Sequence, residues 1–311
     1  MREINNPGKL ERKAIKGDVN ALSIALIGYL IITSFASLVI VFFGGFRING
    51  IVYLISSLVG MGFIWFCYRD NFDLEDILEE RREIPPKVLL NAFVCIVGLQ
   101  PVFQLLSQAI ALAFEAAGYR IAFSEPDPHN GGFVFVMLNA VVFGPAVEEV
   151  LFRGVALRAL SRYGRNFAIV AGAILFGLYH ANFPQFGHSF AAGLILGYIT
   201  FRYAIKWAIV LHCMHNLLMI AVSMLDVPWF INYGFFGIFS LWAIVILIVK
   251  FDKIKRFFDK GRSLANAYKY AFATLSLLAY VAVTVFLAIT HTHIQLSSEY
   301  LETPPPDLPR V

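Results

Sequence analysis

Long uncharged runs alternate with short charged segments along the chain. Windows such as Ala21–Phe43, Ile51–Cys67 and Phe235–Val249 contain no Asp, Glu, Lys or Arg. Each window is long enough, or nearly so, to cross a hydrocarbon core of about 30 Å as a helix. Strands of a membrane barrel alternate apolar and polar positions, and these windows do not. The pattern therefore predicts an all-α fold, a polytopic bundle of about eight or nine transmembrane helices with a polar pocket opening into the membrane core.

Turn residues between the apolar windows set the boundaries of the expected spans. Nine candidate spans lie at residues 20–43, 50–68, 88–117, 132–157, 166–182, 188–202, 206–225, 228–250 and 270–290. The fifth and sixth contain several Gly and His residues, which favours tilted or partly re-entrant segments. Whether these two spans cross the membrane completely stays open.

On this prediction the chain divides into five successive segments. These are a cytoplasmic N-terminal segment (1–19), N-terminal transmembrane helices (20–131), a central transmembrane core (132–225), C-terminal transmembrane helices (226–291) and a polar tail (292–311). Within the second segment, Asp70–Glu83 alternates acidic and apolar residues, so either an amphipathic surface helix or a solvated loop is expected. The end of the tail, Glu299–Val311, contains three consecutive prolines and is expected to be extended.

Basic residues predict the orientation, because Lys and Arg in short loops stay on the cytoplasmic side. With the N-terminus inside, the inside segments hold 21 of the 25 Lys and Arg residues. The outside segments hold Arg47, Arg120 and Arg310, and Arg153 lies within a span. The sequence therefore predicts a multi-pass cell-membrane protein with a cytoplasmic N-terminus and an outside C-terminus.

Composition agrees with a membrane protein and narrows the partners. Hydrophobic residues make up 59% of the 311 residues, above the roughly half-apolar average of soluble domains. The net charge of +4 reflects the topology and contact with the lipid bilayer, and no nucleic-acid partner is expected. Cys67, Cys95 and Cys213 stand singly in apolar runs, so neither a disulfide framework nor a cysteine metal cluster is predicted.

Three charged residues lie within six positions of the fourth expected span. An ionisable side chain in a span costs about 2.5–3.5 kcal/mol on insertion scales, so its presence needs a reason. Glu149 and Arg153 are four residues apart and can form an ion pair on one helix face. Glu148 points about 100° away and has no such local partner. A carboxylate without a cation beside it suits a general base, and Pro145 removes one backbone hydrogen bond nearby.

Two later spans carry polar residues at helical spacing. His180 follows Phe176 by four residues in the fifth expected span. Asn216 follows His212 by four residues in the seventh. Glu148 lies roughly 15 Å, His180 roughly 21 Å and His212 roughly 9 Å from the cytoplasmic end of its span, at about 1.5 Å per residue. These depths allow the groups to meet near the middle of the membrane if the helices tilt or kink.

Taken together, the motifs resemble those of one known family. In chain order they are Glu148-Glu149-x-x-x-Arg153, Phe176-x-x-x-His180 and His212-x-x-x-Asn216. This set resembles the CPBP family, which contains the type II CAAX prenyl endopeptidases and bacteriocin-processing or Abi proteins. The resemblance covers about Phe133–Ile220, and the spans on either side carry no comparable signal.

The resemblance implies a glutamate-type intramembrane endopeptidase whose catalytic core is the segment 132–225. Glu148 and His180 would activate a water molecule, and His212 with Asn216 would stabilise the tetrahedral oxyanion. Glu149 would support the site together with Arg153. The implied substrate is a membrane-associated protein or peptide, and no cofactor is expected. The residue types fit these roles, because hydrolysis needs a base and donors aimed at developing negative charge.

Two other functions could use the same residues. Glu148, His180 and His212 could be the three protein ligands of a zinc-dependent membrane hydrolase, although the chain has no HExxH helix. Alternatively, the charged motif could only sort helices or bind a partner in a non-catalytic membrane scaffold or immunity protein. His188 and His215 are interpreted as polar packing residues. The substrate, and whether it is prenylated, stays open.

Overall fold

The computed structural model describes residues 7–44, 50–69, 82–123, 133–225, 228–262, 265–290 and 292–296, and most of this part is helical. The helices are α1 (Pro7–Gly44), α2 (Gly50–Tyr68), α4 (Pro86–Ala116), α5 (Phe133–Leu138), α6 (Gly144–Glu149), α7 (Leu157–Ser161), α8 (Arg165–Tyr179), α9 (Phe183–Arg202), α10 (Ile205–Ser223), α11 (Trp229–Val249), α12 (Phe251–Arg262), α13 (Ala265–Phe272) and α14 (Leu275–Thr290). Two π-helical segments, η2 (Asn139–Phe143) and η3 (Val150–Ala156), join α5, α6 and α7 into one continuous helix.

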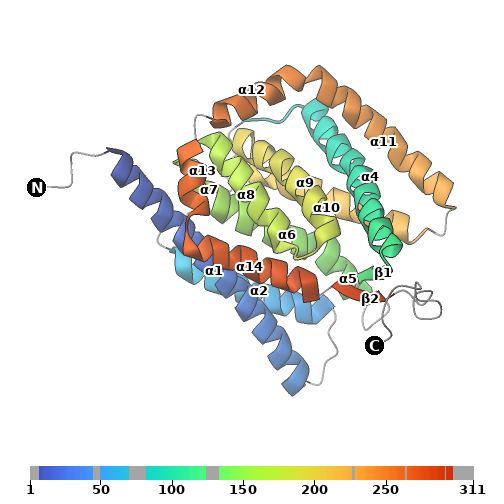
Figure 1. Cartoon of the computed structure of the whole chain (residues 1–311), viewed down its shortest axis with the longest axis horizontal. Helices are drawn as coiled ribbons and strands as arrows, with labels where there is room; N and C mark the ends of the chain where they lie inside the picture. The colour runs from blue at the N-terminus through green and yellow to red at the C-terminus, as the bar shows by residue number, and fades with distance from the viewer. Residues whose placement is uncertain are drawn as a thin grey trace, which may run out of the picture.

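Helices α8, α9 and α10 lie between two outer groups, with α1, α2 and α14 on one side and α4 and α11 on the other (Figure 1). Buried apolar side chains of α1, η3, α8 and α14 form one core cluster, and a second cluster joins α4, α9 and α10. Small residues permit this packing. A Cβ added to Gly193 of α9 would lie 3.0 Å from Ala173 Cα of α8. The close contact of α8 with α9 fixes the helices that carry the site.

Six helices among the described residues are long and apolar enough to cross a membrane, or seven if α13 and α14 form one bent span. Their outward faces carry apolar side chains, such as Phe42 (77% exposed), Leu241 (67%) and Ile248 (68%). Side chains of this kind fit contact with lipid tails, because water would leave a large apolar surface uncovered. The predicted all-α polytopic membrane bundle is confirmed, with a span count close to the expected eight or nine.

Three of the expected spans look different from the prediction. The fifth contains α8, whose 15 residues reach only about 22 Å. The sixth, expected at residues 188–202, lies within the longer α9, which carries Gln185, His188 and Ser189 near its start and is not among the six apolar helices. The ninth is bent by 69° between α13 and α14. Polar residues and breaks therefore account for the difference between nine expected spans and six or seven.

The fourth expected span changes its helical turn twice. In a π-helix each N–H bonds the carbonyl five residues before it, and Gly144 N–H bonds Asn139 O in this way. Pro145 comes next and has no N–H, so it cannot bond the carbonyl of Ala140, five residues before it. Single π-helical turns are frequent at functional sites. Both glutamates of the predicted site lie in α6, between the two π-helical segments.

A short pair of strands, which the sequence did not predict, joins the ends of α4 and α14 (Figure 1). β1 (Tyr119–Phe123) and β2 (Thr292–Leu296) pair antiparallel, with Tyr119 opposite Leu296. β2 occupies the start of the predicted polar tail. The proline-containing end of that tail lies outside the described residues. Residues 70–81 of the predicted amphipathic segment also lie outside them.

Candidate active site

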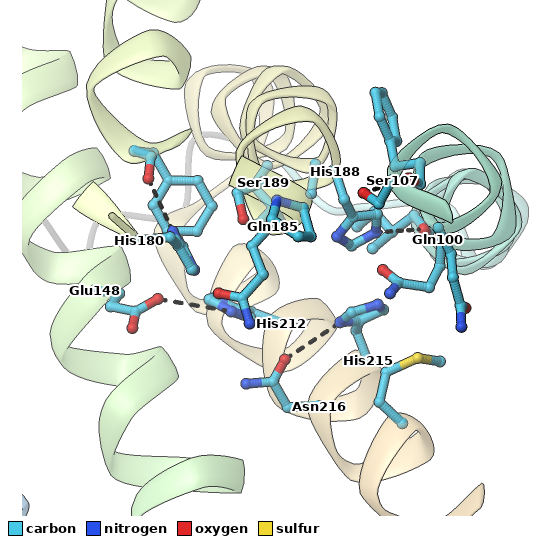
Figure 2. A pocket seen from close by; sticks show the side chains of 18 residues that line it. Gln100, Ser107, Glu148, His180, Gln185, His188, Ser189, His212, His215 and Asn216 are labelled. Carbon is cyan, nitrogen blue, oxygen red and sulfur yellow. Dashed lines mark hydrogen bonds and ion pairs between the residues drawn. The ribbon is translucent and has the colours of Figure 1, made fainter. Parts of the chain in front are cut away.

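A pocket of about 540 Å³ lies between α4, α6, α8, α9 and α10. Its size is within the usual range of ligand sites. The four predicted catalytic residues, Glu148, His180, His212 and Asn216, all line it (Figure 2). They come from α6, from the end of α8 and from α10. The fold therefore brings together side chains that lie on three separate spans in the sequence.

Glu149 and Arg153 form the buried ion pair that their spacing predicts. Arg153 Nη1 lies 2.9 Å from Glu149 Oε1, and the two side chains are 3% and 0% exposed. The same carboxylate oxygen lies 2.9 Å from His212 Nδ1. Neither Glu149 nor Arg153 is part of the pocket wall. Glu149 therefore has two partners, the guanidinium group that it neutralises and the imidazole ring that it orients.

Phe176 lines the pocket and also contacts the buried ion pair. The guanidinium carbon of Arg153 lies 4.3 Å from the centre of the Phe176 ring, a cation–π contact that favours the buried charge. The ring centres of His180 and His212 lie 4.8 and 5.8 Å from that of Phe176, in edge-to-face geometry. Phe176 stands in the sequence motif, but no role was predicted for it. It packs against the ion pair and both imidazoles at once.

Glu148 has a different environment from Glu149. Its side chain is 21% exposed, and its Oε2 lies 3.8 Å from His212 Nε2. Among the described residues, no Lys or Arg lies within ion-pair distance of Glu148. Figure 2 shows its carboxylate directed into the pocket, toward His212. Glu148 is therefore the carboxylate that can meet a ligand.

His180 stands at the tight turn between α8 and α9. Its Nδ1 lies 3.0 Å from Phe176 O. Since a carbonyl oxygen only accepts, Nδ1 carries the hydrogen and Nε2 keeps a lone pair. The next residue, Ala181, has a φ of 45°, in the left-handed region that non-glycine residues seldom adopt. Backbone strain of this kind is common at functional sites, and here it directly follows His180.

Asn216 connects α10 to the helix that carries Glu148. Its Nδ2 donates to Ala140 O at 2.9 Å, the carbonyl to which Pro145 cannot donate. Its Oδ1 accepts from His215 Nδ1 at 3.2 Å. An amide nitrogen carries two hydrogens, so one of them is available to a ligand in the pocket.

Two histidines that were interpreted as packing residues also line the pocket. His188 of α9 and His215 of α10 stack with ring centres 4.9 Å apart and planes inclined by 23°. His188 Nε2 donates to Ile96 O at 3.0 Å. The sequence contained a signal for this part of the pocket, which the prediction did not use. Gln100, Gln104 and Ser107 follow one another at spacings of four and three, which gives the third span a polar face toward the pocket.

The described residues contain no group of three or more His, Cys, Asp or Glu side chains arranged to hold a metal ion. Each of His180 and His212 has its Nδ1 bonded to a protein oxygen, so in the neutral ring only Nε2 has a lone pair to offer. The predicted absence of a cofactor stays a prediction. Cys67, Cys95 and Cys213 are free thiols.

The helical bundle and its pocket define an integral membrane protein that brings a carboxylate, two imidazoles and an amide to one buried site. The family model described as type II CAAX prenyl endopeptidase Rce1-like matches residues 130–218, which include every motif residue from Glu148 to Asn216. This match supports CPBP family membership for the segment that carries the motifs, as they predicted, and it suggests CAAX-type intramembrane protease activity. None of the curated proteins and none of the solved structures matches the chain.

Proposed function

We propose that the protein is a glutamate-type intramembrane endopeptidase, which hydrolyses a peptide bond of a membrane-associated protein or peptide in CAAX-type or bacteriocin-type processing. The observation that carries the proposal is the difference between the two adjacent glutamates. Glu149 is bonded to Arg153, whereas Glu148 lines the pocket and has no Lys or Arg partner among the described residues. The family match over residues 130–218 supports the peptidase activity.

In the proposed mechanism, Glu148 and His180 activate the attacking water. The Glu148 carboxylate and His180 Nε2 are both acceptors on the pocket wall, so a water molecule between them donates one hydrogen to each. As the water oxygen bonds to the carbonyl carbon of the substrate, Glu148 takes one of the water protons. The carbonyl oxygen then becomes the oxyanion of a tetrahedral intermediate.

His212 and Asn216 are the proposed donors to this oxyanion. Asn216 offers the second hydrogen of Nδ2, since the first is bonded to Ala140 O. His212 Nδ1 donates to Glu149, so Nε2 also donates only when the ring is an imidazolium. The Glu149 carboxylate stabilises that positive charge. When the intermediate collapses, the C–N bond breaks and Glu148 returns its proton to the leaving amine.

The proposal is tested by comparing peptide termini in cells with the native protein and in cells with Glu148→Ala. We expect a set of C-terminal or N-terminal peptides that appears only with the native protein and that comes from membrane-associated proteins. Glu148→Ala protein must be present at the native level for the comparison to count. Identical termini in both cell lines would remove the endopeptidase and favour a scaffold or immunity protein.

A zinc-dependent hydrolase is the alternative that uses the same side chains. In their neutral forms His180 and His212 keep lone pairs at Nε2, so atoms that could coordinate zinc are present. Removing metal with a chelator therefore distinguishes the two functions. We expect the purified enzyme to keep its activity in a strong chelator. Loss of activity that zinc restores, with one bound ion per chain, would support the metallohydrolase.

For the orientation, we propose a cytoplasmic N-terminus and an outside C-terminus, supported by the unequal distribution of basic residues. A reporter fused near Gly261 should then be inside, and one fused after Glu299 should be outside. The segment between them contains α13 and α14, which are bent by 69°. Two reporters on the same side would mean that this bent pair enters and leaves the membrane on one face.

A further inference from the structure

The pocket continues from the catalytic side chains into a second region between α4, α9 and α10. We call this region the polar arm, and it consists of Gln100, Gln104, Ser107, His188, Ser189 and His215. None of these residues is Asp, Glu, Lys or Arg. Figure 2 shows His188 and His215 side by side at the end of the pocket that is farther from Glu148. The proposed chemistry uses none of these side chains.

The hydrogen bonds around Asn216 determine which nitrogen of His215 carries the hydrogen. Ala140 O can only accept, so the Asn216 group that faces it is the NH₂. The other end of the amide is then the oxygen, Oδ1, which faces His215 Nδ1 at 3.2 Å. His215 Nδ1 must therefore donate. In the neutral ring this leaves Nε2 as an acceptor with a free lone pair.

This acceptor is buried and lacks a partner. His215 is 8% exposed, and its Nε2 has no hydrogen-bond partner among the described residues. The ring cannot turn freely, because it stacks on His188, which in turn donates to Ile96 O of α4. Buried acceptors are nearly always satisfied in proteins. Because His215 lines the pocket, a ligand that supplies an N–H or O–H group could satisfy this acceptor after a small shift of the side chains that cover it.

The composition of the polar arm indicates what kind of ligand this is. A peptide main chain presents one donor and one acceptor per residue, and glutamine amides and serine hydroxyls can bond both. A free carboxylate does not fit beside His215 Nε2, because two acceptors would face each other. The arm also has no lysine or arginine to neutralise such a charge. An internal stretch of peptide backbone meets both conditions.

We propose that the polar arm binds the main chain of the peptide substrate and that His215 Nε2 accepts an N–H of that chain. This inference rests on the proposed endopeptidase function and specifies its substrate subsite. His212 and His215 are three residues apart, roughly 4.5 Å along α10. An extended peptide advances roughly 3.3 Å per residue. The N–H bound by His215 therefore belongs to a residue one or two positions from the scissile bond.

The test uses a synthetic peptide with a prenylated cysteine followed by three residues, and a series in which each backbone amide is N-methylated in turn. Steady-state cleavage is measured with protein in lipid nanodiscs. His215→Asn keeps an N–H donor one bond from Cγ, where Nδ1 lies, but has no acceptor at the position of Nε2. Met214→Ala is the control, because Met214 is on the same helix, 43% exposed and outside the pocket wall.

With the native enzyme, methylation of one particular amide should lower kcat/KM by about tenfold, the effect of one lost hydrogen bond. His215→Asn should raise KM for the unmethylated peptide by about the same factor, with kcat nearly unchanged. This variant should also cleave the sensitive methylated peptide at the same rate as the unmethylated peptide. Met214→Ala should retain the native pattern. Equal responses of native and His215→Asn enzymes to every methylated peptide would overturn the inference while leaving the endopeptidase function intact.

If the native enzyme cleaves none of these peptides, the proposed function fails for prenylated substrates. Peptide binding then tests the polar arm by itself. Binding is then measured with Glu148→Gln protein, with and without His215→Asn. A methylation that weakens binding only when His215 is present supports the main-chain subsite. No binding, or the same loss in both proteins, rejects it.

Discussion

On the α6 side of the pocket, the carboxylates of Glu148 and Glu149 and the guanidinium group of Arg153 gather around the His212 ring. The polar arm on the α4 side contains only amides, hydroxyls and imidazoles. The charged side is connected by bonds within the protein, since Glu149 holds Arg153 and His212 together. The polar arm ends in His215 Nε2, an acceptor without a hydrogen-bond partner in the part of the chain that the structure describes. Glu149 Oε2 and Arg153 Nη2 on the charged side also have no hydrogen-bond partner among the described residues, but neither residue lines the pocket, whereas His215 does.

This difference separates two tasks that a peptidase must perform. Charge-bearing groups in a low-dielectric site act strongly on developing charge, so we assign them to the chemical step of the proposed reaction. Uncharged donors and acceptors can hold a peptide backbone in place, so we assign the polar arm to substrate binding. Substitutions on the charged side should therefore change folding or kcat, and substitutions in the polar arm should change KM.

The largest effects are expected from the two adjacent glutamates, and they should differ in kind. Glu149→Gln leaves Arg153 without its buried counter-charge, which should lower the free energy of unfolding by about 3–5 kcal/mol. It also removes the carboxylate beside His212. We expect low yield of folded protein and little activity, measured by size-exclusion chromatography and thermal unfolding in detergent.

Glu148→Gln is the matched variant. Glu148 is partly exposed and has no Lys or Arg partner among the described residues, so the amide should be accommodated without loss of folded protein. The rate should fall by at least about 10²–10⁴ because the general base is lost. If the two glutamine variants had the same yield and the same activity, the division of roles between these neighbours would be wrong.

Asn216→Ala should have the next largest effect. Removing one oxyanion donor lowers kcat by about 10²–10³, with little change in KM. Because Asn216 also donates to Ala140 O, we expect a further loss of about 1–3 kcal/mol in stability from the unsatisfied carbonyl. His212→Ala should act in the same direction on kcat. In steady-state kinetics, the fold-decrease in kcat of the double variant should be smaller than the product of the two single decreases, because the residues act as a unit.

A variant that restores the bond to Ala140 separates the two roles of Asn216. Asn216→Asp keeps the size of the side chain but has no N–H, so both roles are lost together. Asn216→Gln keeps the amide on a longer side chain. Recovery of stability without activity in Asn216→Gln would show that the oxyanion contact needs the native position. Full activity in Asn216→Ala would contradict the oxyanion role.

Charged residues made the site predictable from the sequence. Glu148, Glu149 and Arg153 stand out in an apolar span, because each needs a physical reason to be there. The spacing of four residues correctly predicted the Glu149–Arg153 pair. It could not predict that Glu149 also bonds His212, since that contact depends on how α6 and α10 pack. The π-helical turns were also hidden, since no residue pattern in the span showed where the backbone hydrogen bonds change to π-helical spacing.

Neutral polar residues gave a weaker signal. Gln100 and Gln104 cost less in a membrane span than charged residues, so neither stood out individually. His215 was interpreted as a packing residue from its position relative to His212, but the pocket is wide enough for both to line it. The strand pair was missed for another reason. β1 and β2 are five residues each and lie far apart in the sequence, and only the folded bundle brings them together.

His188 should show the smallest effect, and it tests whether the polar arm works through fixed geometry. Its Nε2 donates to Ile96 O, and its ring supports His215 by stacking. Gln carries its amide nitrogen about as far from the backbone as Nε2, whereas Asn does not. His188→Asn should therefore lose about 0.5–1.5 kcal/mol of stability from this hydrogen bond. KM should rise a few-fold, because His215 is held less firmly, and kcat should stay near the native value.

His188→Gln should recover most of the stability, but its KM should stay above the native value, since it lacks the ring. Thermal unfolding and steady-state kinetics on the three proteins measure both quantities. A large fall in kcat for either variant would place His188 with the charged side, and the separation of chemistry from binding across the pocket would then be incorrect.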